Sequence, residues 1–154
     1  MKYEIIMLNE KIVVGIMKQT TNVGGQSVKD IGEVWQQFIT TGIYEKIMGK
    51  VNHKAIGLYT DYEGDFTRPY DFLACCEVMD HEKLEGSLTK KVIPKGKYAK
   101  FIINGDVKEA VGQFWTKLWQ LDLDRAYTCD FEEYQNNSQD MKNQEIHIYI
   151  SLKE

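Results

Sequence analysis

The sequence has too few cysteines for a disulfide framework, since it contains only three. Cys75 and Cys76 are adjacent, so on a β-strand they would point to opposite faces, and Cys129 lies far along the chain. We expect three reduced thiols, which is typical of a reducing cytoplasm. The first eleven residues lack the long apolar run and the cleavage site of a signal peptide, which also favours a cytoplasmic location.

Basic clusters and long apolar runs are missing as well. The net charge is −4, and the longest run of lysine or arginine is the pair Lys90–Lys91. Direct binding of nucleic acid normally needs a basic patch that faces the phosphates, so this role is not expected. No apolar run approaches the length of a membrane span, and no membrane contact is expected either.

Motifs for metal binding and for catalysis are also absent from the sequence. The three histidines, His53, His81 and His147, are scattered, and none has the Cys/His spacing of a metal site. No Ser-His-Asp or Cys-His arrangement, phosphate-binding loop or dinucleotide fingerprint occurs. We therefore expect neither a metal nor a cofactor.

The sequence does contain one pattern of elements that occurs twice. Apolar periodicity predicts strand, helix, strand, strand in residues 1–80 and again in residues 90–154, with residues 80–89 as a linker. The expected strands cover residues 3–17 (broken at Asn9–Glu10), 55–62, 70–79, 98–103, 125–134 and 145–152. The expected helices run from an N-cap at Ser27 to near Gly42, and from an N-cap at Asp106 to Leu121. Residues 43–54 fit either a short helical turn or a loop, and residues 136–143 a polar turn.

The two halves also share weak sequence similarities. Tyr62 and Tyr134 end corresponding strands 72 residues apart, and Trp35 in the first helix corresponds roughly to Trp115 in the second. Neither half can bury a sheet face alone. We therefore predict a single α+β domain over residues 1–154, made of duplicated β-α-β-β half-units with pseudo-twofold symmetry. It should have an antiparallel sheet, two main helices and a central pocket between the halves.

The strand at 125–134 carries the most informative polar residues. Alternation places Phe131 and Glu133 on one face, and Glu132 and Tyr134 on the other. A carboxylate two residues from a tyrosine could form the polar end of a pocket. In the first half, Thr60 occupies the position that corresponds to Glu132, so the charge of such a pocket should come from the second half alone.

Three segments in this order resemble the GyrI-like effector-binding domain: IPKGKYAKFIINGD at 93–106, DFEEY at 130–134 and EIHIYISLK at 145–153. That module occurs alone or behind the DNA-binding domains of AraC-type and MerR-type multidrug regulators. The resemblance implies an aromatic pocket with a buried glutamate that neutralises lipophilic, cationic ligands. Glu132 matches this glutamate, and Tyr134 and Tyr149 are its neighbours in the pattern. Because Met1 lies directly before the first strand, the resemblance implies the stand-alone form.

Aromatic residues make up 12% of the chain, and they either line this pocket or form plain core. The first helix has an apolar stripe at Val28, Ile31, Trp35 and Phe38, and Trp115 and Trp119 lie one turn apart on the flank of the second. Glu133 lacks support from the motif and is expected at the surface or rim. The predicted ligand-binding residues are Glu132, Tyr134, Tyr149, Trp115, Trp119, Tyr59, Trp35 and Phe38.

Three functions are compatible with these residues. The first is binding of a lipophilic, cationic small molecule, for sensing or for sequestration. The second is hydrolysis of strained electrophilic rings, as some GyrI-like proteins do, with Glu132 as general base and Tyr134 as donor. The third is interaction with a protein partner, such as a transcription regulator or gyrase.

Overall fold

The computed structural model describes residues 1–79, 86–136 and 140–154. Most of the expected linker, residues 80–85, and residues 137–139 of the expected polar turn lie outside this description. The strands are β1 (Glu4–Leu8), β2 (Lys11–Thr20), β3 (Lys50–Thr60), β4 (Tyr70–Val78), β5 (Thr89–Ile93), β6 (Gly96–Gly105), β7 (Arg125–Tyr134) and β8 (Gln144–Leu152). The helices are α1 (Gln26–Thr40), α2 (Ile43–Lys46) and α3 (Val107–Leu118), with a 3-10 turn at Val23–Gly25.

The strands of the described residues form one antiparallel sheet in the order β1-β6-β8-β7-β3-β4-β2-β5. This confirms the predicted α+β class and its duplication. However, the described part of each half has one strand more than predicted. The break at Asn9–Glu10 separates two strands, and β5 was not expected as a strand. Residues 43–54, which the sequence left open, form α2 and the first part of β3.

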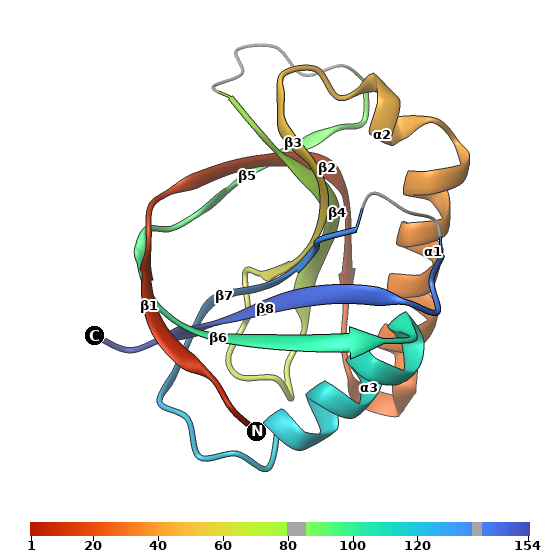
Figure 1. Ribbon diagram of the computed structural model, residues 1–154. Helices are drawn as coiled ribbons and strands as arrows, with labels where there is room; N and C mark the ends of the chain where they lie inside the picture. The colour runs from red at the N-terminus through yellow and green to blue at the C-terminus, as the bar shows by residue number, and fades with distance from the viewer. Residues whose placement is uncertain (80–85, 137–139) are drawn as a thin grey trace.

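The sheet curls because the two halves exchange their first strands. β1 belongs to the first half but pairs with β6, and β5 belongs to the second half but pairs with β2. Only Asn9–Glu10 separates β1 from β2, although these strands lie near opposite ends of the sheet. So short a link can join them only if the sheet curves until its ends approach, and Figure 1 shows the resulting ring of strands.

Gly15 allows one close approach within this curled sheet. It lies opposite Cys75 where β2 pairs with β4. A Cβ atom at position 15 would lie 1.9 Å from the carbonyl oxygen of Ala74, which no real side chain tolerates. A glycine inside a run of β-branched residues therefore marks a point where two backbones come together.

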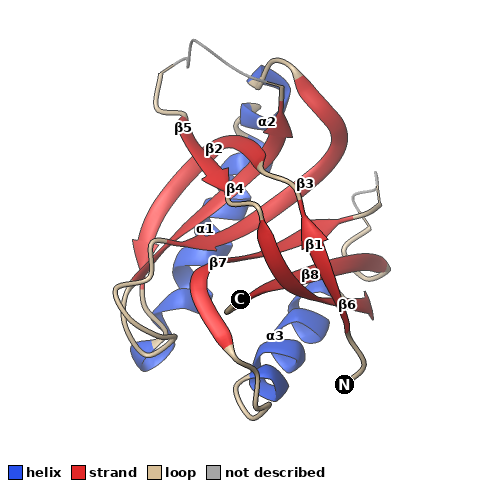
Figure 2. Cartoon of the chain, turned by 90° about the vertical axis from the view of Figure 1, so that its left-hand side faces the viewer, coloured by secondary structure: helices blue, strands red, loops and turns tan. Residues whose placement is uncertain are grey.

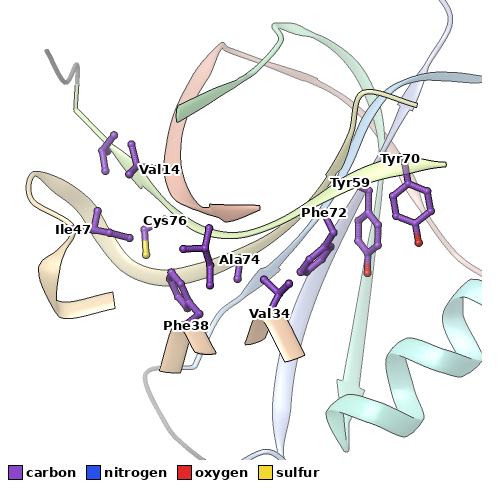
Figure 3. Close-up of a cluster of buried hydrophobic side chains, with 11 residues drawn as sticks. Val14, Val34, Phe38, Ile47, Tyr59, Tyr70, Phe72, Ala74 and Cys76 are labelled. Atoms are coloured by element: carbon purple, nitrogen blue, oxygen red, sulfur yellow. The ribbon is translucent and has the colours of Figure 1, made fainter. Parts of the chain in front are cut away.

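The core formed by the described residues consists of one cluster on the inner face of the curl and two clusters under the helices. The inner cluster holds residues such as Leu58, Cys75, Phe131 and Tyr149. In Figure 2 the strands pass in front of α1, which covers their outer face. Figure 3 shows the α1 cluster, in which Val34 and Phe38 pack against β3 and β4. The third cluster packs Phe114 and Leu118 of α3 against β6 and β8.

Of the two predicted helix N-caps, the structure confirms Asp106 but not Ser27. Asp106 does cap α3, because its carboxylate accepts a hydrogen bond from the backbone N–H of Glu109 at 3.2 Å. Ser27 is not the cap of α1, since the helix begins one residue earlier, after Gly25 in the left-handed conformation. The prediction that Val28 belongs to the buried stripe is also wrong, because this residue is 79% exposed.

Candidate functional site

Glu132 lies at the seam between the two halves, where β7 pairs with β3. It is 1% exposed, and its neighbour across the strand pair is Gly57. The predicted correspondence with Thr60 is wrong, because Thr60 lies opposite Cys129 and therefore on the other face of the sheet. The carboxylate thus lies on the outer face of the sheet, under the helices.

Gly57 makes room for this carboxylate. A Cβ atom at position 57 would lie 2.8 Å from Oε1 of Glu132 and 3.1 Å from Cζ2 of Trp35. Any larger residue would push the glutamate or the tryptophan from its place. Gly57 is a site residue that the sequence did not identify as such, although a glycine inside a strand is a known sign of close approach.

Two tyrosines donate hydrogen bonds to one oxygen of Glu132. The hydroxyl of Tyr134 lies 3.1 Å from Oε1, and that of Tyr59 lies 3.4 Å from the same atom. Figure 3 shows the hydroxyl of Tyr59 pointing away from the strands. Within the described part of the chain, Oε2 is buried without a hydrogen-bond partner.

Burial raises the pKa of Glu132 to about 7, from 4.5. Loss of water disfavours the charged carboxylate, and the hydroxyls of Tyr134 and Tyr59, together with the nearby indole N–H of Trp115, offset this only in part. The side chain is therefore divided between its neutral and its charged form near neutral pH. A positive charge that arrived beside it would favour the charged form.

Trp35 and Trp115 bring aromatic rings to Glu132 from both halves. Trp35 of α1 lies edge-on to Tyr134, with ring centroids 5.3 Å apart, and Trp115 of α3 lies 5.0 Å from Tyr59. Both tryptophans follow a glycine by three residues, and burial along residues 31–40 and 111–120 is the same residue by residue. The predicted correspondence of the two tryptophans is confirmed.

Three of the predicted ligand-binding residues lie away from the carboxylate. Trp119 is 42% exposed and stacks on Phe66 at 5.4 Å, because α3 ends one residue earlier. Tyr149 stacks on Phe131 at 4.5 Å in the inner cluster, on the opposite face of the sheet from Glu132. The predictions that these two share a pocket with Glu132 are wrong. Phe38 is buried behind Trp35 as core.

Glu133 is more buried than predicted. It is 8% exposed, and its carboxylate lies 3.8 Å from Nζ of Lys54 and accepts a hydrogen bond from Gln135 at 2.8 Å. Of the two places expected for it, surface or rim, the exposed surface is therefore wrong. Its side chain lies on the opposite face of β7 from Glu132, so the two glutamates do not share one site.

Arg125 and Asp130 form a buried ion pair on the same strand, which the sequence did not reveal. Nη2 of Arg125 lies 2.6 Å from Oδ2 of Asp130, and the two side chains are 6% and 0% exposed. The hydroxyl of Tyr62 donates to the same oxygen at 2.6 Å, and the backbone N–H of Ser151 donates to Oδ1 at 3.0 Å. The guanidinium also lies 4.3 Å from the ring of Tyr127.

The carboxylate of Glu132 is 1% exposed, and the hydroxyls of Tyr59 and Tyr134 contact it directly. A hollow of about 230 Å³ among the described residues lies away from Glu132, at the end of β6 and the start of β8. Its lining is polar: Asn104, Gly105, Asn136, Asn143, Gln144 and Glu145. No group of acidic, histidine or cysteine side chains in the described ranges is arranged to hold a metal.

A family model named Cass2, integron-associated effector binding protein, matches residues 4–152. The chain belongs to this effector-binding family. Membership confirms the predicted resemblance to effector-binding domains and supports binding of a small molecule. It assigns neither the ligand nor the residues that contact it.

Relatives of this family member extend over nearly its whole length. A solved integron cassette protein from Vibrio cholerae is 28% identical, with a TM-score of 0.79, covering 98% of this chain and 95% of that one. The Bacillus subtilis (strain 168) protein YobU, named as a candidate transcriptional regulator, is 25% identical over 97% of this chain and 96% of its own length. The structure of SAV2435 bound to tetraphenylphosphonium has a TM-score of 0.77 at 20% identity, covers 99% of this chain and 94% of that one, and shows the shared fold.

None of the helices in residues 1–79, 86–136 and 140–154 is long and apolar enough to span a membrane.

Proposed function

We propose that this protein binds lipophilic organic cations between the sheet and the helices, with Glu132 as the charge partner. The observation that carries the proposal is a fully buried carboxylate under aromatic rings. In the described residues no lysine, arginine or histidine forms an ion pair with it. A buried acid of this kind is costly, and such a cost is commonly retained for function.

The chemistry of the site suits a flat or bulky cation. Two unit charges 4 Å apart attract each other by about 4 kcal/mol at an effective dielectric constant of 20. The faces of Trp35, Tyr59 and Trp115 would add cation–π contacts and apolar area. The ligand would enter by displacing these rings, of which Trp35 and Trp115 are partly exposed, together with the partly exposed Tyr134.

The relatives support binding of a small molecule in general. SAV2435, which shares the fold, was solved with a lipophilic cation, tetraphenylphosphonium. YobU is named for a role in transcription. We therefore propose a cytoplasmic sensor or sequestering protein whose ligand-bound form acts on a transcription regulator or on gyrase.

Hydrolysis is the second candidate, and one observation favours it. A carboxyl group with a pKa of about 7 beside the hydroxyl of Tyr134 at 3.1 Å would suit a general base and its donor. However, a hydrolase also needs a water molecule at the carboxylate, and Glu132 is covered by rings and 1% exposed. The burial therefore favours binding over turnover.

Two probes of the same shape and opposite charge test the proposal. At pH 8 tetraphenylphosphonium should bind, and tetraphenylborate should bind at least 100-fold more weakly, by titration calorimetry. Glu132→Gln should weaken phosphonium binding about 100-fold, because about 3 kcal/mol of the attraction is lost. Glu133→Gln is the matched control and should leave the affinity for tetraphenylphosphonium within threefold of the wild type, because Glu133 lies on the opposite face of the sheet from Glu132. Equal affinity of the two probes, or an unchanged affinity in Glu132→Gln, would refute the proposal.

A further inference from the structure

Three buried side-chain atoms of the described residues lack a hydrogen-bond partner, and all three belong to one part of the molecule. They are Oε2 of Glu132, Nε1 of Trp115 and Nε of Arg125. Buried polar groups in folded proteins are nearly always paired, and an unpaired one is destabilising. Three unpaired atoms around one binding site indicate partners that the ligand supplies.

Trp115 connects these three residues. Its ring lies 5.0 Å from the ring of Tyr59, whose hydroxyl donates to Glu132. The guanidinium of Arg125 lies 6.0 Å from the same indole ring. The indole N–H also favours the charged form of Glu132, although the two groups do not reach hydrogen-bond geometry. The indole nitrogen thus lies near the carboxylate but is not satisfied by it.

The unpaired atoms differ in chemistry. Glu132 offers an acceptor, which suits a positive charge, whereas Trp115 and Arg125 offer N–H donors. A hydrocarbon-only cation such as tetraphenylphosphonium can satisfy the carboxylate, but it leaves both donors unpaired. Only a ligand that carries an acceptor atom close to its positive charge can satisfy both kinds of group.

We propose that the preferred ligands are lipophilic cations with a hydrogen-bond acceptor, such as a carbonyl or ether oxygen, next to the cationic centre. The indole N–H of Trp115 donates to this oxygen while Glu132 faces the positive charge. The inference rests on the proposed function, since it names the ligand class of the same site. A site built to hydrogen-bond a group discriminates strongly against analogues that lack it.

Arg125 holds Trp115 in position for this contact. Its guanidinium is fixed by the 2.6 Å ion pair with Asp130 and by the ring of Tyr127, 4.3 Å away. The same group lies over the indole of Trp115. Because this cation is neutralised by Asp130, it does not cancel the attraction between Glu132 and a positively charged ligand.

A matched pair of cations tests this inference. Trimethyl(phenacyl)ammonium and trimethyl(2-phenylethyl)ammonium have the same charge and nearly the same shape, but only the first has a carbonyl oxygen. In calorimetric titrations at pH 8 the wild-type protein should bind the phenacyl compound at least tenfold more tightly. Trp115→Phe keeps a ring but removes the N–H, so the ratio of affinities should fall below threefold. Trp119→Phe is the control and should leave the ratio unchanged, because Trp119 is exposed on Phe66.

Other affinities would overturn either the inference or the assignment of the donor to Trp115. Equal affinities in the wild type would show that water or the protein already satisfies the donors, and would overturn the inference. A preference that survives in Trp115→Phe would overturn the assignment of the donor to Trp115. In Glu132→Gln the affinities for both cations should fall by the same factor, so that their ratio is unchanged. This result distinguishes the role of Glu132 from that of Trp115. If neither cation binds the wild type while tetraphenylphosphonium does, the inference is overturned and the proposed function stands; if tetraphenylphosphonium fails to bind as well, the proposed function fails.

Discussion

Replacing Arg125 by methionine should lower the free energy of unfolding by about 3–5 kcal/mol, measured by urea denaturation at pH 7. The carboxylate of Asp130 is 0% exposed and lies 2.6 Å from the guanidinium. Methionine fills a similar volume but has no charge, so Asp130 would remain buried without a counter-ion. The hydroxyl of Tyr62 and the N–H of Ser151 would still donate to it, but neither is charged.

Two further variants make this result specific to the buried charge. The double variant Arg125→Met/Asp130→Asn should regain at least about 2 kcal/mol of the loss, because no uncompensated charge remains. Lys91 and Asp61 form an ion pair of nearly the same length, 2.7 Å, on the surface. Lys91→Met should therefore cost less than about 1 kcal/mol. A cost below 1 kcal/mol for Arg125→Met as well would contradict the buried ion pair.

Glu132 should make the free protein less stable as the pH rises from 4.5 to 8. Its pKa is about 7 in the folded protein and near 4.5 in the unfolded chain. Between these values the folded state holds a proton that the unfolded chain has lost, so stability falls with increasing pH. The difference of about 2.5 pKa units corresponds to about 3 kcal/mol, which is fully lost above pH 7.

Comparison with Glu132→Gln isolates this contribution from all other titrating groups. The stability of the variant relative to the wild type should increase by about 3 kcal/mol between pH 4.5 and pH 8. Urea denaturation at steps of half a pH unit measures the change. A constant difference over this range would mean that the pKa of Glu132 is ordinary, and that the carboxylate is hydrated.

The sequence predicts the duplication and the main residues of the site, because both depend on local periodicity. Alternation along residues 125–134 places Glu132 and Tyr134 on one face, which the structure confirms through their 3.1 Å hydrogen bond. Helical spacing places Trp35 and Trp115 at equivalent positions, and both lie beside the carboxylate. The asymmetry of charge was predicted with the wrong counterpart, since Thr60 lies on the opposite face of the sheet from Glu132.

The exchange of β1 and β5 between the halves could not be predicted from the sequence. The residues of a strand do not by themselves determine with which other strand it pairs. A break at Asn9–Glu10 is equally compatible with a bulge in one strand and with two strands in different places. Which of these occurs depends on the register of β1 against β6 and of β2 against β5. These registers are set by contacts between distant parts of the chain.

The predictions for Tyr149 and Trp119 were wrong because they depended on strand register and on the end of a helix, which the sequence does not fix. Register between β7 and β8 places Ile148 beside Glu132, so Tyr149 lies on the opposite face. The helix α3 ends at Leu118, so Trp119 no longer follows the direction of Trp115. The ion pair of Arg125 and Asp130 was missed because an irregularity between these residues breaks the simple alternation of β7.

Protons and ligand cations should compete for Glu132, and this competition tests the account most directly. The measurement is the affinity for tetraphenylphosphonium from pH 5 to pH 8, for the wild-type protein and for Glu132→Gln. With a pKa of about 7 and a protonated form that binds about 100-fold more weakly, the wild-type affinity should rise about fivefold per pH unit from pH 5 to pH 7, reach about 50-fold by pH 8, and then level off. The variant should bind with the weak affinity of the protonated form at every pH. An affinity that does not depend on pH in the wild type, or the same dependence in the variant, would contradict Glu132 as the charge partner of the ligand.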